Sequence, residues 1–215
     1  MKRTISLMAG ICVVIGLAVN GPLHAEPVAY SALAEFRAAL PVEPRVLDFD
    51  HLPSGTKIEN AASTDGITFQ YDFDGLAMKV SHLYATTSAP NFLGTVDGGM
   101  FHDGDNFTLA FPPGRAIGLF FISADPLLDG DIKISAGGRT AALVADDVHA
   151  TLSDGSRVYF LGIVDDQTAF TNARVEALPG GFFLYNIDDI ITAPLRNPAV
   201  AAAGGDYSAT VATDR

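Results

Sequence analysis

Short alternating runs of apolar and polar residues fill this sequence from Pro44 onward, and they constrain its fold more than any other feature. Gly, Asp, Asn and Pro separate the runs, as expected for short strands joined by tight turns. About ten strands at this spacing predict an all-β protein, an antiparallel β-sandwich of jelly-roll type. The expected strands are 45–50, 67–73, 78–83, 106–111, 116–123, 131–136, 140–145, 148–152, 157–164, 173–178 and 182–187.

Some of these strands also indicate which of their faces are buried. The run 67–73 places its large apolar residues on one face and polar residues on the other, so we expect a sheet with one face exposed to solvent. The runs 116–122 (AIGLFFI) and 158–164 (VYFLGIV) are apolar on both faces, which predicts central strands. In the last run, Phe183, Tyr185 and Ile187 share one face, and an Asp188-Asp189 pair follows.

One amphipathic helix is predicted ahead of the strands, over residues 30–40. Leu33, Phe36 and Leu40 recur at helical spacing, Ser31 is placed to cap the start, and Pro41 ends the helix.

The N-terminus has the pattern of a Sec-type signal peptide over residues 1–25. Lys2 and Arg3 precede an apolar run over 5–19, and cleavage is expected after Ala25. An uncleaved membrane anchor is the alternative, but the run is shorter than the ~20 residues that a spanning helix needs. We therefore expect a secreted or periplasmic protein with no membrane span after cleavage.

The remaining chain is expected to form one domain over residues 26–195, followed by a flexible tail over 196–215 that is rich in Ala, Gly and Thr. Cleavage removes the only cysteine, Cys12, so no disulfide is expected. It leaves 11 basic residues against 25 acidic ones, a formal charge of −14. Such an acidic chain repels nucleic acid and anionic lipid, which argues against both as partners.

Two acidic segments, 46–50 (VLDFD) and 186–189 (NIDD), suggest a metal site. Jelly rolls often bring their first and last strands side by side, so these carboxylates are expected to meet. Carboxylate, amide and carbonyl oxygens are the ligands that Ca²⁺ requires. The candidate ligands are Asp48, Asp50, Asp188, Asp189 and Asn186. The competing interpretation is that these are strand-end acids facing water.

Other kinds of site have weaker support. The acidic Gly-rich loops do not match the full calcium-loop spacing, and the histidines have no paired zinc spacing. No Gly-x-Ser-x-Gly elbow for a nucleophile is present. Nothing selects one pair of acids for glycoside hydrolysis. We therefore assign no catalytic residues.

Four segments resemble a group of secreted bacterial β-sandwich proteins, many of which carry a PEP-CTERM sorting tail. They are 47–60 (LDFDHLPSGTKIEN), 65–69 (DGITF), 159–178 (YFLGIVDDQTAFTNARVEAL) and 182–190 (FFLYNIDDI). The sorting motif itself is absent after Ile191. The resemblance implies secretion and a sandwich fold, and the group's likeness to carbohydrate-binding jelly rolls suggests sugar binding.

The function expected from the sequence is thus non-catalytic binding of an extracellular glycan or envelope component, with a structural Ca²⁺ ion. Two alternatives remain open: a matrix protein that self-associates without binding sugar, and a hydrolase that acts on glycans.

Overall fold

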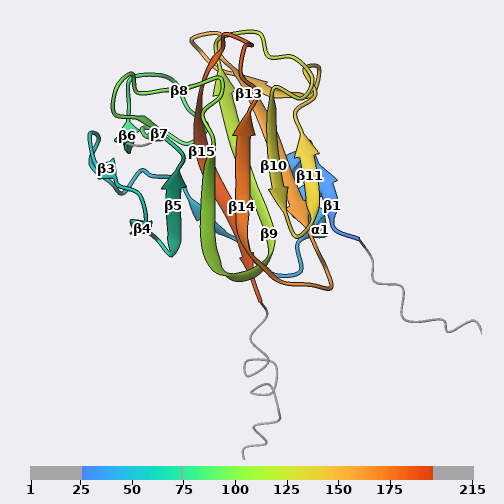
Figure 1. The fold of residues 1–215 in the computed structure, drawn as a ribbon. Coiled ribbons are helices and arrows are strands. Elements are labelled where there is room, and N and C mark those ends of the chain that lie inside the picture. Colours follow the sequence, from blue (N-terminus) through green and yellow to red (C-terminus); the bar gives the residue numbers. More distant parts are fainter. Residues whose placement is uncertain (1–25, 74, 196–215) are drawn as a thin grey trace, which may run out of the picture.

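The computed structural model describes residues 26–73 and 75–195, which form an antiparallel β-sandwich with one short helix (Figure 1). The predicted fold class is therefore confirmed. The predicted signal peptide (1–25) and tail (196–215) lie outside the described residues. Within the described part, no helix is long and apolar enough to cross a membrane.

The longest strand, β9 (Phe107–Ser123), belongs to both sheets. Its first part pairs with β5 (Ile67–Tyr71) and β14 (Phe170–Ala177). Its second part pairs with β13 (Arg157–Val164) and β15 (Leu184–Pro194). In Figure 1 the strand turns at the foot of the sandwich and runs back up.

The bend in β9 lies at Pro112-Pro113-Gly114. Proline lacks an N–H group for the ladder, so pairing is interrupted there and the strand changes sheets. The sequence predicted separate strands over 106–111 and 116–123, whereas the structure joins them into one.

The other strands complete the two sheets. The first sheet runs in the order β4, β5, β9, β14, β10, β11, and adds β4 (Ser63–Thr64), β10 (Ile132–Ala136) and β11 (Arg139–Ala142). In the second sheet, β1 (Val28–Tyr30) and β12 (Val148–Thr151) pair with β13. On the other side, β15 pairs with β2 (Arg45–Leu47), β7 (Phe92–Thr95) and β8 (Phe101–His102). Beyond β7 come β6 (Met78–Ser81) and β3 (Lys57–Ile58).

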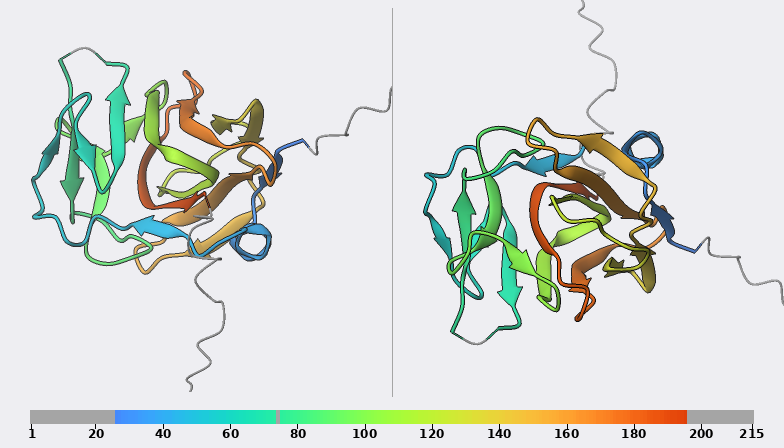
Figure 2. Two further views of the ribbon diagram at one scale, coloured as in Figure 1. Left: turned by 90° about the horizontal axis from the view of Figure 1, so that it is seen from below. Right: turned by 90° about the horizontal axis from the view of Figure 1, so that it is seen from above.

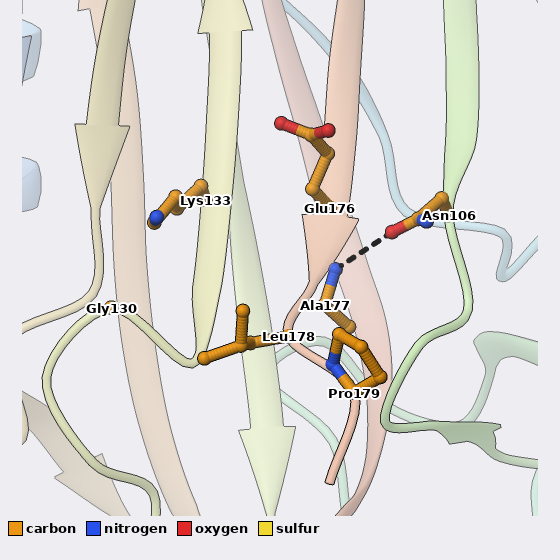
Figure 3. Close-up of a pocket in the computed structure, with 7 residues that line it drawn as sticks. All are labelled: Asn106, Gly130, Lys133, Glu176, Ala177, Leu178 and Pro179. Carbon is orange, nitrogen blue, oxygen red and sulfur yellow. Dashed lines mark hydrogen bonds between the residues drawn. The ribbon is translucent and has the colours of Figure 1, made fainter. Parts of the chain in front are cut away.

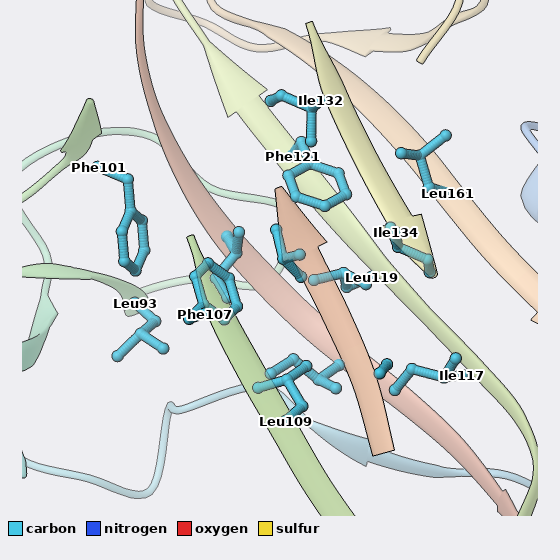
Figure 4. Close-up of a cluster of buried hydrophobic side chains, with 14 of the residues drawn as sticks. Leu93, Phe101, Phe107, Leu109, Ile117, Leu119, Phe121, Ile132, Ile134 and Leu161 are labelled. Carbon is cyan, nitrogen blue, oxygen red and sulfur yellow. The ribbon is translucent and has the colours of Figure 1, made fainter. Parts of the chain in front are cut away.

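The main core lies between the sheets. The two parts of β9 contribute Phe107 and Leu109 from one side and Leu119 and Phe121 from the other, and all four are fully buried (Figure 4). Burial of such side chains contributes about 1.5–3 kcal/mol each.

A second apolar cluster covers the outer face of the second sheet. Helix α1 (Leu33–Ala39) lies against this sheet, end-on in Figure 2, and its Phe36 is fully buried. Beneath Phe36 lie Gly118 and Gly162, which are cross-strand partners on β9 and β13. A Cβ atom at Gly162 would lie 2.5 Å from the Phe36 ring, so glycine makes room for the helix. The prediction that both faces of these strands are buried is confirmed.

The prediction for the helix was wrong at its start. Residues 28–30 form strand β1, and the helix begins at Leu33 after an N-cap residue, Ala32, that makes no side-chain capping bond. Ser31 does not cap the helix, because its Oγ donates to Asp147 across the surface at 2.6 Å. Pairing of β1 with β13 outweighs the local helical pattern.

We predict that Gly162→Ala destabilises the protein by about 1–3 kcal/mol, because the new methyl group displaces Phe36. Urea unfolding will measure the loss. Gly98→Ala is the matched control, since no atom lies within 4 Å of its Cβ position. Equal stabilities of the two variants would contradict the packing described here.

Candidate metal centre

The two acidic segments lie side by side. Strand β2 pairs with β15 through Leu47 opposite Ile190 and Val46 opposite Ile191. In an antiparallel pair, the next residues outward from Leu47 and Ile190 are Asp48 and Asp189, so these two acids adjoin each other.

The sequence predicted that the last strand ends before the aspartates. This was wrong, because β15 continues through them to Pro194. Asp188 and Asp189 lie at an irregularity in the pairing of β15 with β9. From the pair Asp188–Phe120 to the pair Ile191–Gly118, β15 advances by three residues and β9 by two. Asp189 adopts a left-handed φ of 49° there. This is a β-bulge, which turns the two carboxylates away from simple alternation.

Asp188 is fully buried, and its carboxylate is surrounded by donors from one loop. Its Oδ2 accepts hydrogen bonds from the hydroxyl of Thr86, from Thr87 Oγ1 at 2.9 Å and from Ser88 N at 3.0 Å. Its Oδ1 accepts from Asp189 N at 2.8 Å. The loop between β6 and β7 thus closes over the carboxylate.

The same loop also holds Asp50. Asn91, where the loop enters β7, donates its backbone N–H to Asp50 Oδ1 at 2.9 Å. Its side-chain amide donates to the carbonyls of Phe49 and Leu52. A single loop therefore connects both acidic segments.

Asp48, Asp50, Asp188 and Asp189 lie where β2 meets β15, and we call this group the acidic junction. Its carboxylates repel one another. Burial, together with the charge of Asp189, raises the pKa of Asp188 to about 7, although the hydrogen bonds from Thr86, Thr87 and Ser88 oppose this shift. Burial also raises the pKa of Asp189, and the charges of Asp48 and Asp50 add to the effect.

No lysine or arginine among the described residues forms an ion pair with these four acids. His51 approaches Asp48 at 4.0 Å and is half exposed.

Asn186 supplies a further buried oxygen. It lies two residues before Asp188 on β15, on the face opposite Tyr185 and Ile187, which point into the main core. It is only 2% exposed, and its Oδ1 has no hydrogen-bond partner. A buried polar atom without a partner costs about 1–3 kcal/mol, so such an atom calls for a ligand or a water molecule.

A buried carboxylate without a basic partner is stabilised by hydrogen bonds, of which Asp188 accepts several, and further by taking up a proton or binding a cation. Asp188 and Asn186 carry oxygens of the kind that Ca²⁺ binds, whereas the hydroxyls of Thr86 and Thr87 already donate to Asp188. Within residues 26–73 and 75–195, no three His, Cys, Asp or Glu side chains converge in a way that could hold a metal ion.

Sequence reasoning missed the loop residues of this site. Thr86, Thr87, Ser88 and Asn91 were not predicted to contact the acids, and β7 was not predicted as a strand. The three consecutive hydroxyl residues were the only signal, and such runs are common in turns.

We predict that, in chelator, the wild-type protein loses stability relative to Asp188→Asn as the pH rises from about 4 to about 7. The pKa of Asp188 is higher in the folded state than in the unfolded chain, so the folded state binds more protons in this window and its stability falls as they leave. The relative loss is on the order of 2–4 kcal/mol. Urea unfolding at several pH values will measure it, with exposed Asp146→Asn as the control. Parallel curves for wild type and Asp188→Asn would refute the assignment.

Comparisons with known proteins do not place the chain in a family. No family model and no curated protein matches the sequence. One solved structure that is similar is titled "Crystal Structure Analysis of the K2 Cleaved Adhesin Domain of Lys-gingipain (Kgp)". It superposes with a TM-score of 0.46 at 9% identity, covering 70% of this chain and 97% of that chain. A TM-score at this level does not establish a common fold.

Proposed function

We propose that this protein is a secreted, non-catalytic binding module that recognises an extracellular glycan or an envelope component and is stabilised by a Ca²⁺ ion at the acidic junction. The observation that carries the binding role is the contrast between the two outer faces of the sandwich. One is covered by α1 and the second apolar cluster, whereas the other is open and polar.

The open face belongs to the first sheet. Cross-strand pairing aligns one polar row over all five strands from β5 to β11. The row consists of Gln70, Thr108, Arg174, Ser135 and Thr140.

Hydrogen bonds hold four of the five residues in this row. Arg174 forms an ion pair with Asp72 and donates to Thr108 Oγ1 at 3.4 Å, while the hydroxyls of Ser135 and Thr140 lie 2.8 Å apart. Hydroxyl and guanidinium groups held in this way, beside the amide of Gln70, can both donate to and accept from the hydroxyls of a sugar chain. Preorganisation of this kind lowers the entropic cost of binding.

The acidic junction supports the calcium part of the proposal. Asp188 is fully buried without a basic partner in the described residues, and Asn186 Oδ1 is buried nearby along the strand without a donor. A divalent cation would compensate both, because it screens the repulsion among the carboxylates and coordinates neutral oxygens.

We predict that Ca²⁺ raises the melting temperature of the chain beginning at Glu26. At a hundredfold excess over Kd, a ligand of the folded state stabilises it by about 2.7 kcal/mol. For a domain of this size, this corresponds to roughly 5–10 °C. Differential scanning calorimetry in chelator and then in Ca²⁺ will show the shift.

The double variant Asp50→Asn/Asp188→Asn is expected to abolish the calcium-dependent rise. The control, Asp146→Asn/Asp166→Asn, removes the same charge from exposed positions and should retain the rise. An equal response in both double variants would exclude the junction as the binding site.

We predict that Ser135→Trp weakens retention on a polysaccharide to which the wild type binds, because its indole ring would stand in the middle of the polar row. Affinity electrophoresis on immobilised polysaccharides measures retention. Ser54→Trp, at an exposed turn outside the open face, is the control and should be retained as the wild type is.

If the wild type is retained on no polysaccharide yet sediments as large assemblies, the protein is a self-associating matrix component instead. Equal retention of both tryptophan variants would show that the binding surface lies outside the open face.

A further inference from the structure

A pocket of about 170 Å³ lies at the edge of the open face where β14 ends and β9 begins (Figure 3). Three of its residues, Asn106, Lys133 and Glu176, form the next polar row of the same sheet, two residues along each strand from Thr108, Ser135 and Arg174. Leu178 and Pro179 close the pocket beyond the end of β14. The pocket is therefore continuous with the polar row.

Hydrogen bonds between separate loops hold the pocket in shape. On one side, Asn106 Oδ1 accepts from Ala177 N at 3.0 Å, and Gly104 N donates to Ala177 O at 3.0 Å. Slightly further along, Gly180 N donates to Asp103 Oδ2 at 2.7 Å. These bonds join the segment before β9 to the segment after β14.

On the other side, the nearly buried Asp131 anchors the loop before β10. Its carbonyl accepts from Leu178 N at 2.7 Å, and its Oδ2 accepts from Leu128 N at 2.6 Å. Three chain segments are thus fixed to one another around the pocket, and a preformed concavity of this kind is typical of a ligand site.

The polar groups of the pocket are available to a ligand. Asn106 uses its oxygen for Ala177, which leaves the Nδ2 group as a donor of fixed orientation. No hydrogen bond or ion pair joins Lys133 to Glu176, although they are cross-strand partners, and Figure 3 shows their charged ends pointing apart. The site thus offers two donors and one acceptor beside an apolar wall, Leu178 and Pro179.

We propose that this pocket binds a single neutral sugar ring of a glycan that lies along the open face. The inference rests on the proposed function and specifies its ligand. Sugar hydroxyls both donate and accept, so different hydroxyls of one ring can pair with an ammonium, an amide or a carboxylate. The C–H face of the ring lies against Leu178 and Pro179.

The size of the pocket and the charge of the chain favour a small neutral ligand. The pocket is smaller than the roughly 300–1,000 Å³ of sites for drug-sized molecules, so it takes one ring and not a whole oligosaccharide. A chain with 25 acidic residues repels uronates, sulfates and phosphates.

The test compares Lys133→Ala/Glu176→Ala with Lys57→Ala/Glu59→Ala, which removes the same pair of charges from exposed positions at β3. Affinity electrophoresis on starch, dextran, galactan and xylan, with polygalacturonate as an anionic comparator, measures binding. We expect the pocket variant to bind at least tenfold more weakly than wild type to a neutral polysaccharide, and the β3 variant to bind as wild type does.

A second measurement uses free glucose, galactose, mannose and glucuronate as NMR probes. Amide shifts of Gly130, Ala177 and Leu178 that respond to a neutral hexose but not to glucuronate support the site. Undiminished binding by the pocket variant overturns this inference and leaves the proposed function intact. Failure of the wild type to bind any polysaccharide overturns this inference together with the glycan part of the proposed function.

Discussion

Strand β9 is the constraint on which the rest of the molecule depends. Its two parts lie in different sheets, and through them it pairs with β5, β14, β13 and β15. The bend at its two prolines sets how the sheets face each other and therefore where the core lies. It also decides which faces point outward, and α1 covers only one of these. The asymmetry between a covered face and an open face follows from this arrangement.

Acidic side chains on the two sides of the sandwich have different surroundings. On the open face, Asp72 is paired with Arg174, and both remain partly exposed. At the junction of β2 and β15, Asp188 is buried among hydroxyl groups with no such partner within the described residues. An exposed pair of the first kind contributes about 0–1 kcal/mol. A buried carboxylate of the second kind is strongly unfavourable unless a proton or a cation accompanies it. Because burial raises the pKa of Asp188, the stability of the fold depends on pH at this junction.

Much of the fold and part of the site could be predicted from the sequence. Alternating residues identified most strands, and the acids near β2 and in β15 meet because those strands pair. The bulge could not be predicted, since the left-handed conformation of Asp189 depends on its partners in β9 and β2. Nor could the contact of Thr86 with Asp188, because the two lie about a hundred residues apart and no local pattern joins them. The start of α1 was wrong for a similar reason, as β1 is defined by its pairing with β13.

The position of β15 has a consequence for how the protein folds. It is the last described strand in the sequence, yet it lies inside the second sheet, between β9 on one side and β2, β7 and β8 on the other. A chain emerging from the ribosome lacks the middle of this sheet until β15 is released. Non-local strand pairing of this kind is slow. Folding of the second sheet is therefore delayed until β15 is available, because its central pairings join segments that lie far apart in the sequence.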